Sequence, residues 1–200
     1  MLRGWPIVGV AASIIVAALG ALWFATPDAV AALRASIRVT ARFSAALFLL
    51  AFTASALWRF WPSAWTRWQL QNRRYLGVSF AVSHFIHLLA ILTLRTVAPS
   101  ELADVATVTW VFGGLAYVFI AAMTATSFDR TAQALGPRAW TILHTVGSYY
   151  VWIIFANSYF SRAVMMPEYI PVAVLLGVAL GLRIAARIAR TRVQQPVAAG

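Results

Sequence analysis

The sequence predicts an all-α integral membrane protein, a six-helix bundle with both termini in the cytoplasm. Hydrophobic residues make up 62% of the 200 residues and charged residues only 10%, against about 45–50% and about 25% in soluble domains. Long apolar stretches without charge recur along the chain, and a helix needs about 20 such residues to cross a bilayer. All 16 basic residues are arginines, and most of them lie between the apolar stretches.

Each expected span is a run of apolar residues with charged residues near its ends. The first, 4–26, contains IVGVAASIIVAALGALWF and is longer than the apolar region of about 7–15 residues in a cleaved signal peptide. We therefore expect a retained helix. The second, 43–61, contains FSAALFLLAFTASALW and continues past Arg59. The later spans are expected at 75–95, 105–128, 139–161 and 169–189, and a short tail at 193–200 completes a single transmembrane domain.

The arginines predict the orientation of the bundle. Six spans place both termini on one side of the membrane, and that side carries eleven of the arginines, against five on the other. By the positive-inside rule the richer side is cytoplasmic. This pattern explains the formal net charge of +11, so we expect a lipid bilayer and no nucleic acid as partner. The eleven are Arg3, Arg59, Arg67, Arg73, Arg74, Arg130, Arg138, Arg183, Arg187, Arg190 and Arg192; the five are Arg34, Arg38, Arg42, Arg95 and Arg162.

Three of the arginines in the last span, Arg183, Arg187 and Arg190, recur at helical spacing. They form one stripe on the helix surface. We interpret this stripe as the cytoplasmic end of the last helix lying against anionic lipid, and not as a binding site.

The composition excludes several kinds of chemistry. The chain contains no cysteine, so thiolate catalysis and iron–sulfur ligation are excluded. Its five acidic residues lie at the ends of the apolar runs, which argues against a carboxylate pair or a hydrolase triad. No glycine-rich phosphate loop is present. The chemistry is therefore expected to fall on the three histidines.

His84, His87 and His144 all lie inside expected spans. An ionisable residue within a membrane is by default a functional candidate, and neutral imidazole in a helical bundle is the axial ligand of haem iron. At about 1.5 Å per residue, His84 lies about 13 Å from the cytoplasmic end, His87 about 18 Å and His144 about 8 Å. Two ligands of one haem must lie at similar depths in the membrane, and the depth of His84 is closer to that of His144 than the depth of His87 is. The alternative is that each histidine hydrogen-bonds a carbonyl or hydroxyl of a neighbouring helix.

Two motifs resemble a known family. The stretch RRYLG at 73–77, followed by His87 ten residues after the glycine, is similar to the third-helix signature of the ferric-reductase-like transmembrane domain family. Thr126-Ser127, then LGPRAW at 135–140 and His144, resembles the signature that leads into its fifth helix. The resemblance covers about residues 35–165 and is greatest to the haem-binding membrane subunits of bacterial methionine sulfoxide reductase systems (MsrQ type).

The resemblance implies a haem b protein of the bacterial inner membrane. In that family six helices hold haem and pass electrons from a cytoplasmic reductant, flavin or quinol to an acceptor outside. The implied partner is another membrane protein or a periplasmic reductase. The implied iron ligands are His87 and His144; His84 is an addition to the family pattern and a further candidate ligand because it lies inside the same expected span. Arg73, Arg74 and Arg138 would pair with the haem propionates; the other interpretation is that these arginines only fix topology and contact lipid.

One position departs from the family pattern. The family usually has a further histidine 13 residues after the fifth-helix histidine, and Asn157 stands there. Three outcomes stay open: one inner haem on His84 and His144, a haem on His87 without a histidine partner, or a scaffold without haem. The alternative function is accordingly a haemless accessory or structural subunit of a larger membrane complex.

Overall fold

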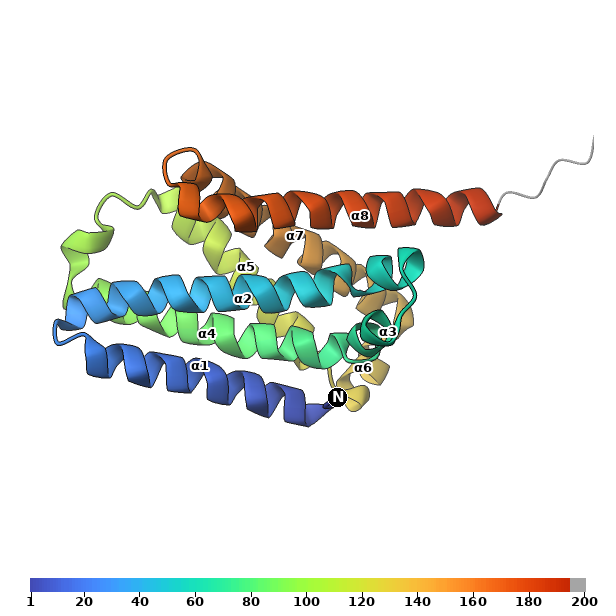
Figure 1. Cartoon of the computed structure of the whole chain (residues 1–200), viewed down its shortest axis with the longest axis horizontal. Helices are drawn as coiled ribbons and strands as arrows, with labels where there is room; N and C mark the ends of the chain where they lie inside the picture. The colour runs from blue at the N-terminus through green and yellow to red at the C-terminus, as the bar shows by residue number, and fades with distance from the viewer. Residues whose placement is uncertain (195–200) are drawn as a thin grey trace, which may run out of the picture.

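The computed structural model describes residues 1–194, which form helices joined by short connections and contain no strand (Figure 1). The expected tail, 193–200, lies outside the described residues apart from its first two, which end the last helix. In chain order the elements are α1 (Trp5–Ala25), α2 (Ala29–Phe60), α3 (Ala64–Gln71), α4 (Arg73–Val97), η1 (Pro99–Leu102), α5 (Thr107–Ala125), α6 (Asp129–Leu135), α7 (Pro137–Ala163), η2 (Pro167–Tyr169) and α8 (Ile170–Gln194).

Six helices within residues 1–194 are long and apolar enough to cross a membrane: α1, α2, α4, α5, α7 and α8. The predicted all-α bundle with six spans is therefore confirmed, and the chain is a multi-pass membrane protein. The N-terminus, α3, α6 and the C-terminal end of α8 lie at the same end of the bundle (Figure 1). We call this the arginine-rich end, because the eleven arginines assigned above to one side lie in the segments that meet there or lead to it.

The expected start of the second helix, residue 43, is wrong. The helix α2 begins at Ala29, where the side chain of Asp28 caps it by accepting a hydrogen bond of 2.6 Å from the Ala31 N–H. Between 29 and 42 the exposed arginines recur every four residues, while the residues on the other face, such as Ser36 and Thr40, are buried. This segment is an amphipathic extension of the span, so its charges do not mark a loop.

The connections also hold more helix than expected. The loops at the arginine-rich end contain α3 and α6, and α3 begins with a capping box between Ser63 and Thr66. At the expected fourth span, 105–128, α5 covers Thr107–Ala125, and at the expected sixth, 169–189, α8 continues to Gln194. These differences lie at the ends of helices, where hydropathy changes gradually.

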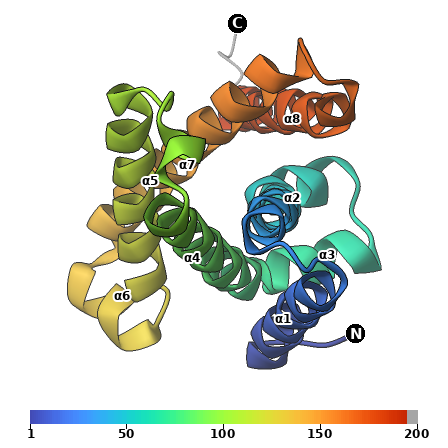
Figure 2. The ribbon, with the colours of Figure 1, turned by 90° about the vertical axis from the view of Figure 1, so that its left-hand side faces the viewer.

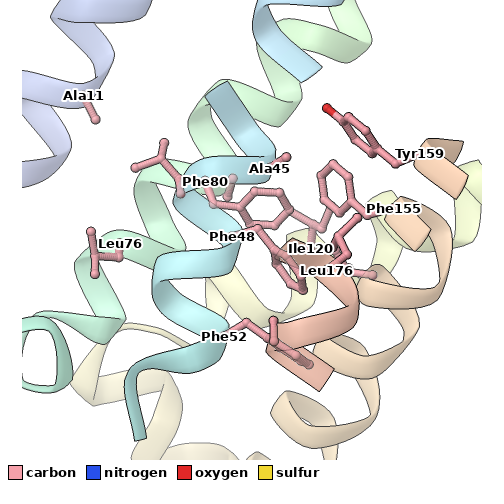
Figure 3. Close-up of a cluster of buried hydrophobic side chains, with 14 of the residues drawn as sticks. Ala11, Ala45, Phe48, Phe52, Leu76, Phe80, Ile120, Phe155, Tyr159 and Leu176 are labelled. Carbon is pink, nitrogen blue, oxygen red and sulfur yellow. The ribbon is translucent and has the colours of Figure 1, made fainter. Parts of the chain in front are cut away.

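The helix α2 occupies a central position in the bundle. It packs most extensively against α4 and also contacts α1, α3 and α8 (Figure 2). A second group is formed by α5 and α7, which pack against each other. The space between the two groups is filled by aromatic and aliphatic side chains, including Phe48, Phe52, Phe80, Ile120 and Phe155 (Figure 3).

Polar side chains join the helices inside this apolar bundle. Ser44 of α2 and Ser83 of α4 share a hydrogen bond of 2.9 Å, and both are buried. Near the arginine-rich end Gln69 donates to the Leu50 carbonyl (2.8 Å), and the Asn72 carboxamide accepts from the Gly4 N–H (3.0 Å). Such contacts fix the register of helices that lipid alone would not order.

A close approach of α5 and α7 depends on Gly147. A Cβ built there would lie 2.8 Å from Met123 Sδ and 3.2 Å from Phe119 Cδ1. We expect Gly147→Val to lower the free energy of unfolding in detergent by about 1–3 kcal/mol, because the added carbons overpack this contact. The measurement is the midpoint of thermal unfolding.

Gly114→Val is the matched control, because no atom lies within 4 Å of a Cβ at Gly114. Its effect is expected to stay below that of Gly147→Val by at least about 1 kcal/mol. Equal midpoints for the two variants would show that the α5–α7 contact does not depend on the glycine.

Candidate cofactor site

A cavity of about 480 Å³ lies between α2, α4, α5 and α7 at the arginine-rich end, with α6 at its edge. This volume is in the range of small-molecule and cofactor pockets, about 300–1,000 Å³. Its apolar walls come from all four helices: Phe48 and Phe52 from α2, Phe80 from α4, Ile120 and Met123 from α5, and Trp140 from α7. The lining therefore suits the apolar body of an amphipathic ligand.

The polar part of the lining contains two of the predicted arginines and one predicted histidine, Arg73, Arg74 and His144. Gly77, one turn after the arginines on α4, also lines the cavity, and a Cβ at Gly77 would meet open space. The motif RRYLG thus places two guanidiniums and a residue without a side chain on the same wall. Arg138 is exposed and is not among the lining residues.

Arg74 is only partly satisfied by the protein. Its Nη1 donates to Asp129 Oδ1 at 2.6 Å, a pair whose carboxylate is largely exposed, so it adds little stability. Its Nε is buried and has no hydrogen-bond partner among the described residues. An unpaired buried donor costs free energy. The site therefore has a donor available for an acceptor that enters the cavity.

His144 is held by two other residues of its motif, Thr126 and Trp140. Its Nε2 lies 3.0 Å from Thr126 Oγ1, and the Thr126 hydroxyl donates its single hydrogen to the Ala122 carbonyl (2.8 Å). The oxygen must then accept from the imidazole, so His144 carries its proton on Nε2. The Trp140 ring stacks on His144 with centroids 4.1 Å apart, and Trp140 Nε1 donates to the Thr126 carbonyl (3.0 Å).

His84 and His87 form a separate pair on α4. Their rings stack with centroids 5.2 Å apart, and neither residue lines the cavity that contains His144. His84 is enclosed by the rings of Phe80, Tyr117 and Phe155, and its Nδ1 is buried without a partner among the described residues. The structure thus brings His84 and His87 together and places His144 apart from them.

The hydrogen bonds of His87 differ from those of His144. Its Nδ1 lies 3.0 Å from Thr40 Oγ1 and 3.1 Å from the Ile37 carbonyl. Since the Thr40 hydroxyl donates to the Ser36 carbonyl (2.7 Å), the proton of His87 is on Nδ1. Its Nε2 keeps a free lone pair, which is the tautomer that metal-ligating histidines use. Both His87 and His144 therefore make the interhelical hydrogen bonds that were the alternative to ligation.

A row of aromatic rings connects the cavity to the histidine pair. Phe48, in the cavity wall, is 5.4 Å from Phe155, and Phe155 is 5.4 Å from His84, measured between ring centroids. His87 continues the row on the same helix. The row thus runs from the cavity toward the opposite end of the bundle.

Asn157 lies on the exposed side of α7, while the neighbouring residues Phe155 and Tyr159 are buried. The position of the expected family histidine therefore points away from His84 and His87. Within residues 1–194, no group of three or more histidine, cysteine or acidic side chains is arranged to hold a metal ion.

Some contacts of the site have no signal in the sequence. Asp129 pairs with Arg74 across 55 positions, and Thr40 reaches His87 across 47. Met123, which lines the cavity, lies in an unremarkable apolar run. Thr126, by contrast, could be found from the sequence, because it belongs to the same motif as His144. In the structure the residues of this motif contact one another through the hydrogen bond between Thr126 and His144.

Comparison with protein-family models, with curated proteins and with solved structures found no match for this chain. The resemblance to the ferric-reductase-like family therefore stays a prediction from the two motifs. The class that the fold defines is a multi-pass α-helical membrane protein.

The contact between Thr126 and His144 can be tested by substitution. We expect Thr126→Val to lower the free energy of unfolding by about 1–2 kcal/mol, because the His144 Nε2–H loses its acceptor inside the bundle. Thr126→Ser keeps the hydroxyl and is expected to lose less than half as much. The measurement is the unfolding midpoint in detergent, and equal losses for the two variants would contradict the assigned hydrogen bond.

Proposed function

We propose that this chain is a haem b-containing electron-transfer protein of the bacterial inner membrane, which passes electrons across the membrane to a partner reductase. The observation that carries the proposal is the cavity at the arginine-rich end. It combines the imidazole of His144 with the guanidiniums of Arg73 and Arg74, and one buried N–H of Arg74 has no partner among the described residues.

The residues of the cavity fit a flat ligand with an anionic edge. Aromatic and aliphatic walls, with Gly77 leaving room on α4, suit a planar macrocycle. Arg73 and Arg74 would hold the propionates by charge-assisted hydrogen bonds. His144 would supply a nitrogen ligand to the iron, and Met123 is a second lining residue of a type that ligates haem iron. Exposed Arg138 would act as a topology determinant only.

When bound, haem would supply the one-electron chemistry, and the protein would supply position and environment. His144 would have to exchange its hydrogen bond with Thr126 for ligation, at a cost of about 1 kcal/mol. The apolar walls would exclude water. The aromatic row through Phe48 and Phe155 gives a direction from the cavity toward His84 and His87.

The distribution of arginines supports the orientation. With the N-terminus and the C-terminal end of α8 at the arginine-rich end, the positive-inside rule would place that end in the cytoplasm. The cavity then lies on the cytoplasmic side, where a flavin or quinol could act as the electron donor. The acceptor would be a membrane or periplasmic protein.

A second candidate function is a haemless accessory subunit of a membrane complex. It is favoured by the histidine geometry, because His144 is hydrogen-bonded through Nε2 and the pair on α4 lies outside the cavity lining. Asn157 also favours it, since that side chain is exposed on the outer face of α7.

An absorbance measurement separates the two functions. We expect the protein, purified in mild detergent from haem-supplemented cells, to show a b-type spectrum in the dithionite-reduced minus oxidised difference. His144→Ala is expected to weaken haem binding at least about tenfold, because a ligand to the iron is lost.

His87→Ala is the matched control, because His87 does not line the cavity, and its spectrum is expected to stay. Absence of any b-type absorbance would favour the accessory-subunit function. Loss of the spectrum in His87→Ala alone would move the haem to the pair on α4.

Placing a histidine at position 157, where the family usually has one, tests whether the bundle contains a second, vacant haem site. We expect Asn157→His to leave the haem content per protein unchanged, because position 157 faces away from His84 and His87. The measurement is the pyridine haemochrome assay, with Asn157→Gln as the control for substitution at this exposed position. An increase by about one haem per chain would show that α7 presents this position to the bundle interior.

A further inference from the structure

A second cavity, of about 280 Å³, lies between α2, α7 and α8. It is separate from the candidate cofactor site and shares no lining residue with it. Its polar lining consists of Ser55 from α2, Thr145 and Tyr149 from α7, and Arg183 and Arg187 from α8. These residues lie in the half of each helix that is nearer the arginine-rich end.

Arg183 is held in place by its neighbours. Its Nη1 donates to the Phe52 carbonyl at 3.1 Å, and its guanidinium carbon lies 4.2 Å and 4.8 Å from the ring centroids of Phe52 and Tyr149. A guanidinium has five N–H donors, and among the described residues no second hydrogen bond uses them. The arginine stripe expected on the surface of the last helix is thus partly turned inward, because Arg183 faces α2 and α7.

The cavity has a surplus of positive charge. No acidic side chain lines it, and the two ion pairs within residues 1–194 involve Arg34 and Arg74, not Arg183 or Arg187. Two guanidiniums therefore face the same space without a counter-ion from the described part of the chain. Such a charge in a membrane protein attracts an anion from its surroundings.

The remaining polar groups are suited to an oxyanion. No hydrogen bond within the described residues uses the hydroxyl groups of Ser55, Thr145 and Tyr149. Together with the arginines they offer several donors around one small cavity, and charge-assisted hydrogen bonds to phosphate are among the strong ones. Arg in particular binds phosphate oxygens through its planar fork.

We propose that this cavity binds the phosphate of an anionic phospholipid headgroup from the leaflet at the arginine-rich end. The lipid, rather than free phosphate, is favoured by the apolar surface beside the polar residues. Val146 follows Thr145 and Ile184 follows Arg183, and both are exposed on helices that span the membrane. Acyl chains would lie along these side chains while the headgroup occupies the cavity.

The test measures thermal unfolding of the full chain in a neutral detergent. Short-chain phosphatidylglycerol is expected to raise the midpoint by about 4 °C or more at saturation. Short-chain phosphatidylcholine and inorganic phosphate at the same concentration are expected to give less than half of that shift. Arg187→Gln is expected to abolish most of the phosphatidylglycerol shift.

Arg130→Gln is the matched control, because Arg130 is exposed at the same end but lies outside this cavity, and its shift is expected to match that of the wild type. Since Arg187 is exposed, its substitution leaves the core intact. Native mass spectrometry of the two variants, purified in parallel, gives a second readout: Arg187→Gln should retain less anionic lipid than Arg130→Gln.

Four results would overturn the proposal. An equal shift with inorganic phosphate would assign the cavity to a free anion. A full phosphatidylglycerol shift in Arg187→Gln, or equal lipid retention in the two variants, would exclude binding at this cavity. The absence of any shift in the wild type would exclude a lipid site. None of these results depends on whether haem is bound.

Discussion

The packing of α2 against α4 is the interaction on which the rest of the structure depends. No water is available in the hydrocarbon to satisfy polar groups, so buried hydroxyls and imidazoles must find partners on neighbouring helices. Ser44 meets Ser83 and Thr40 meets His87 along this one seam. The pairs fix the register of the two helices and so bring Phe48 of α2 onto Phe80 of α4. Those two rings form part of the wall of the candidate cofactor site.

The three histidines take two different roles in this arrangement. His87 is fastened to α2 and keeps a free Nε2, whereas His144 lies at the cavity but donates its Nε2–H to Thr126. His87 therefore has a free Nε2 for ligation but does not line the cavity, whereas His144 lines the cavity but uses its Nε2 in a hydrogen bond. The proposed haem at this cavity would require His144 to release Thr126, and this requirement favours the competing proposal of an accessory subunit. The arginines divide similarly: Arg74 and Arg183 face cavities, and Arg138 is exposed.

The sequence predicted the six spans because apolar runs of about 20 residues are rare outside membrane helices. It failed at residues 29–42, where the exposed arginines, read alone, indicated a loop; the buried Ser36 and Thr40 on the opposite face carry the helix through this segment. His144 was singled out as an ionisable residue inside an expected span and Arg74 through the resemblance of its motif, and both line the cavity. The contacts of these residues with Thr126 and Asp129, and the orientation of Arg183 toward α2 and α7, depend on the rotation and tilt of each helix. Hydropathy does not contain that information.

We propose that the cavity beside His144 holds an anionic, planar cofactor through Arg73 and Arg74. Titration of the purified protein with haemin, followed by absorbance, tests it most directly, with Arg130→Gln as the control variant. We predict that the double variant Arg73→Gln/Arg74→Gln binds haemin at least about tenfold more weakly, because the loss of two charge-assisted hydrogen bonds costs more than 1.4 kcal/mol. The position of the Soret band is expected to stay the same, since the axial ligand is unchanged. Equal affinity of the double variant and the control, or no specific binding by the wild type, would contradict the account.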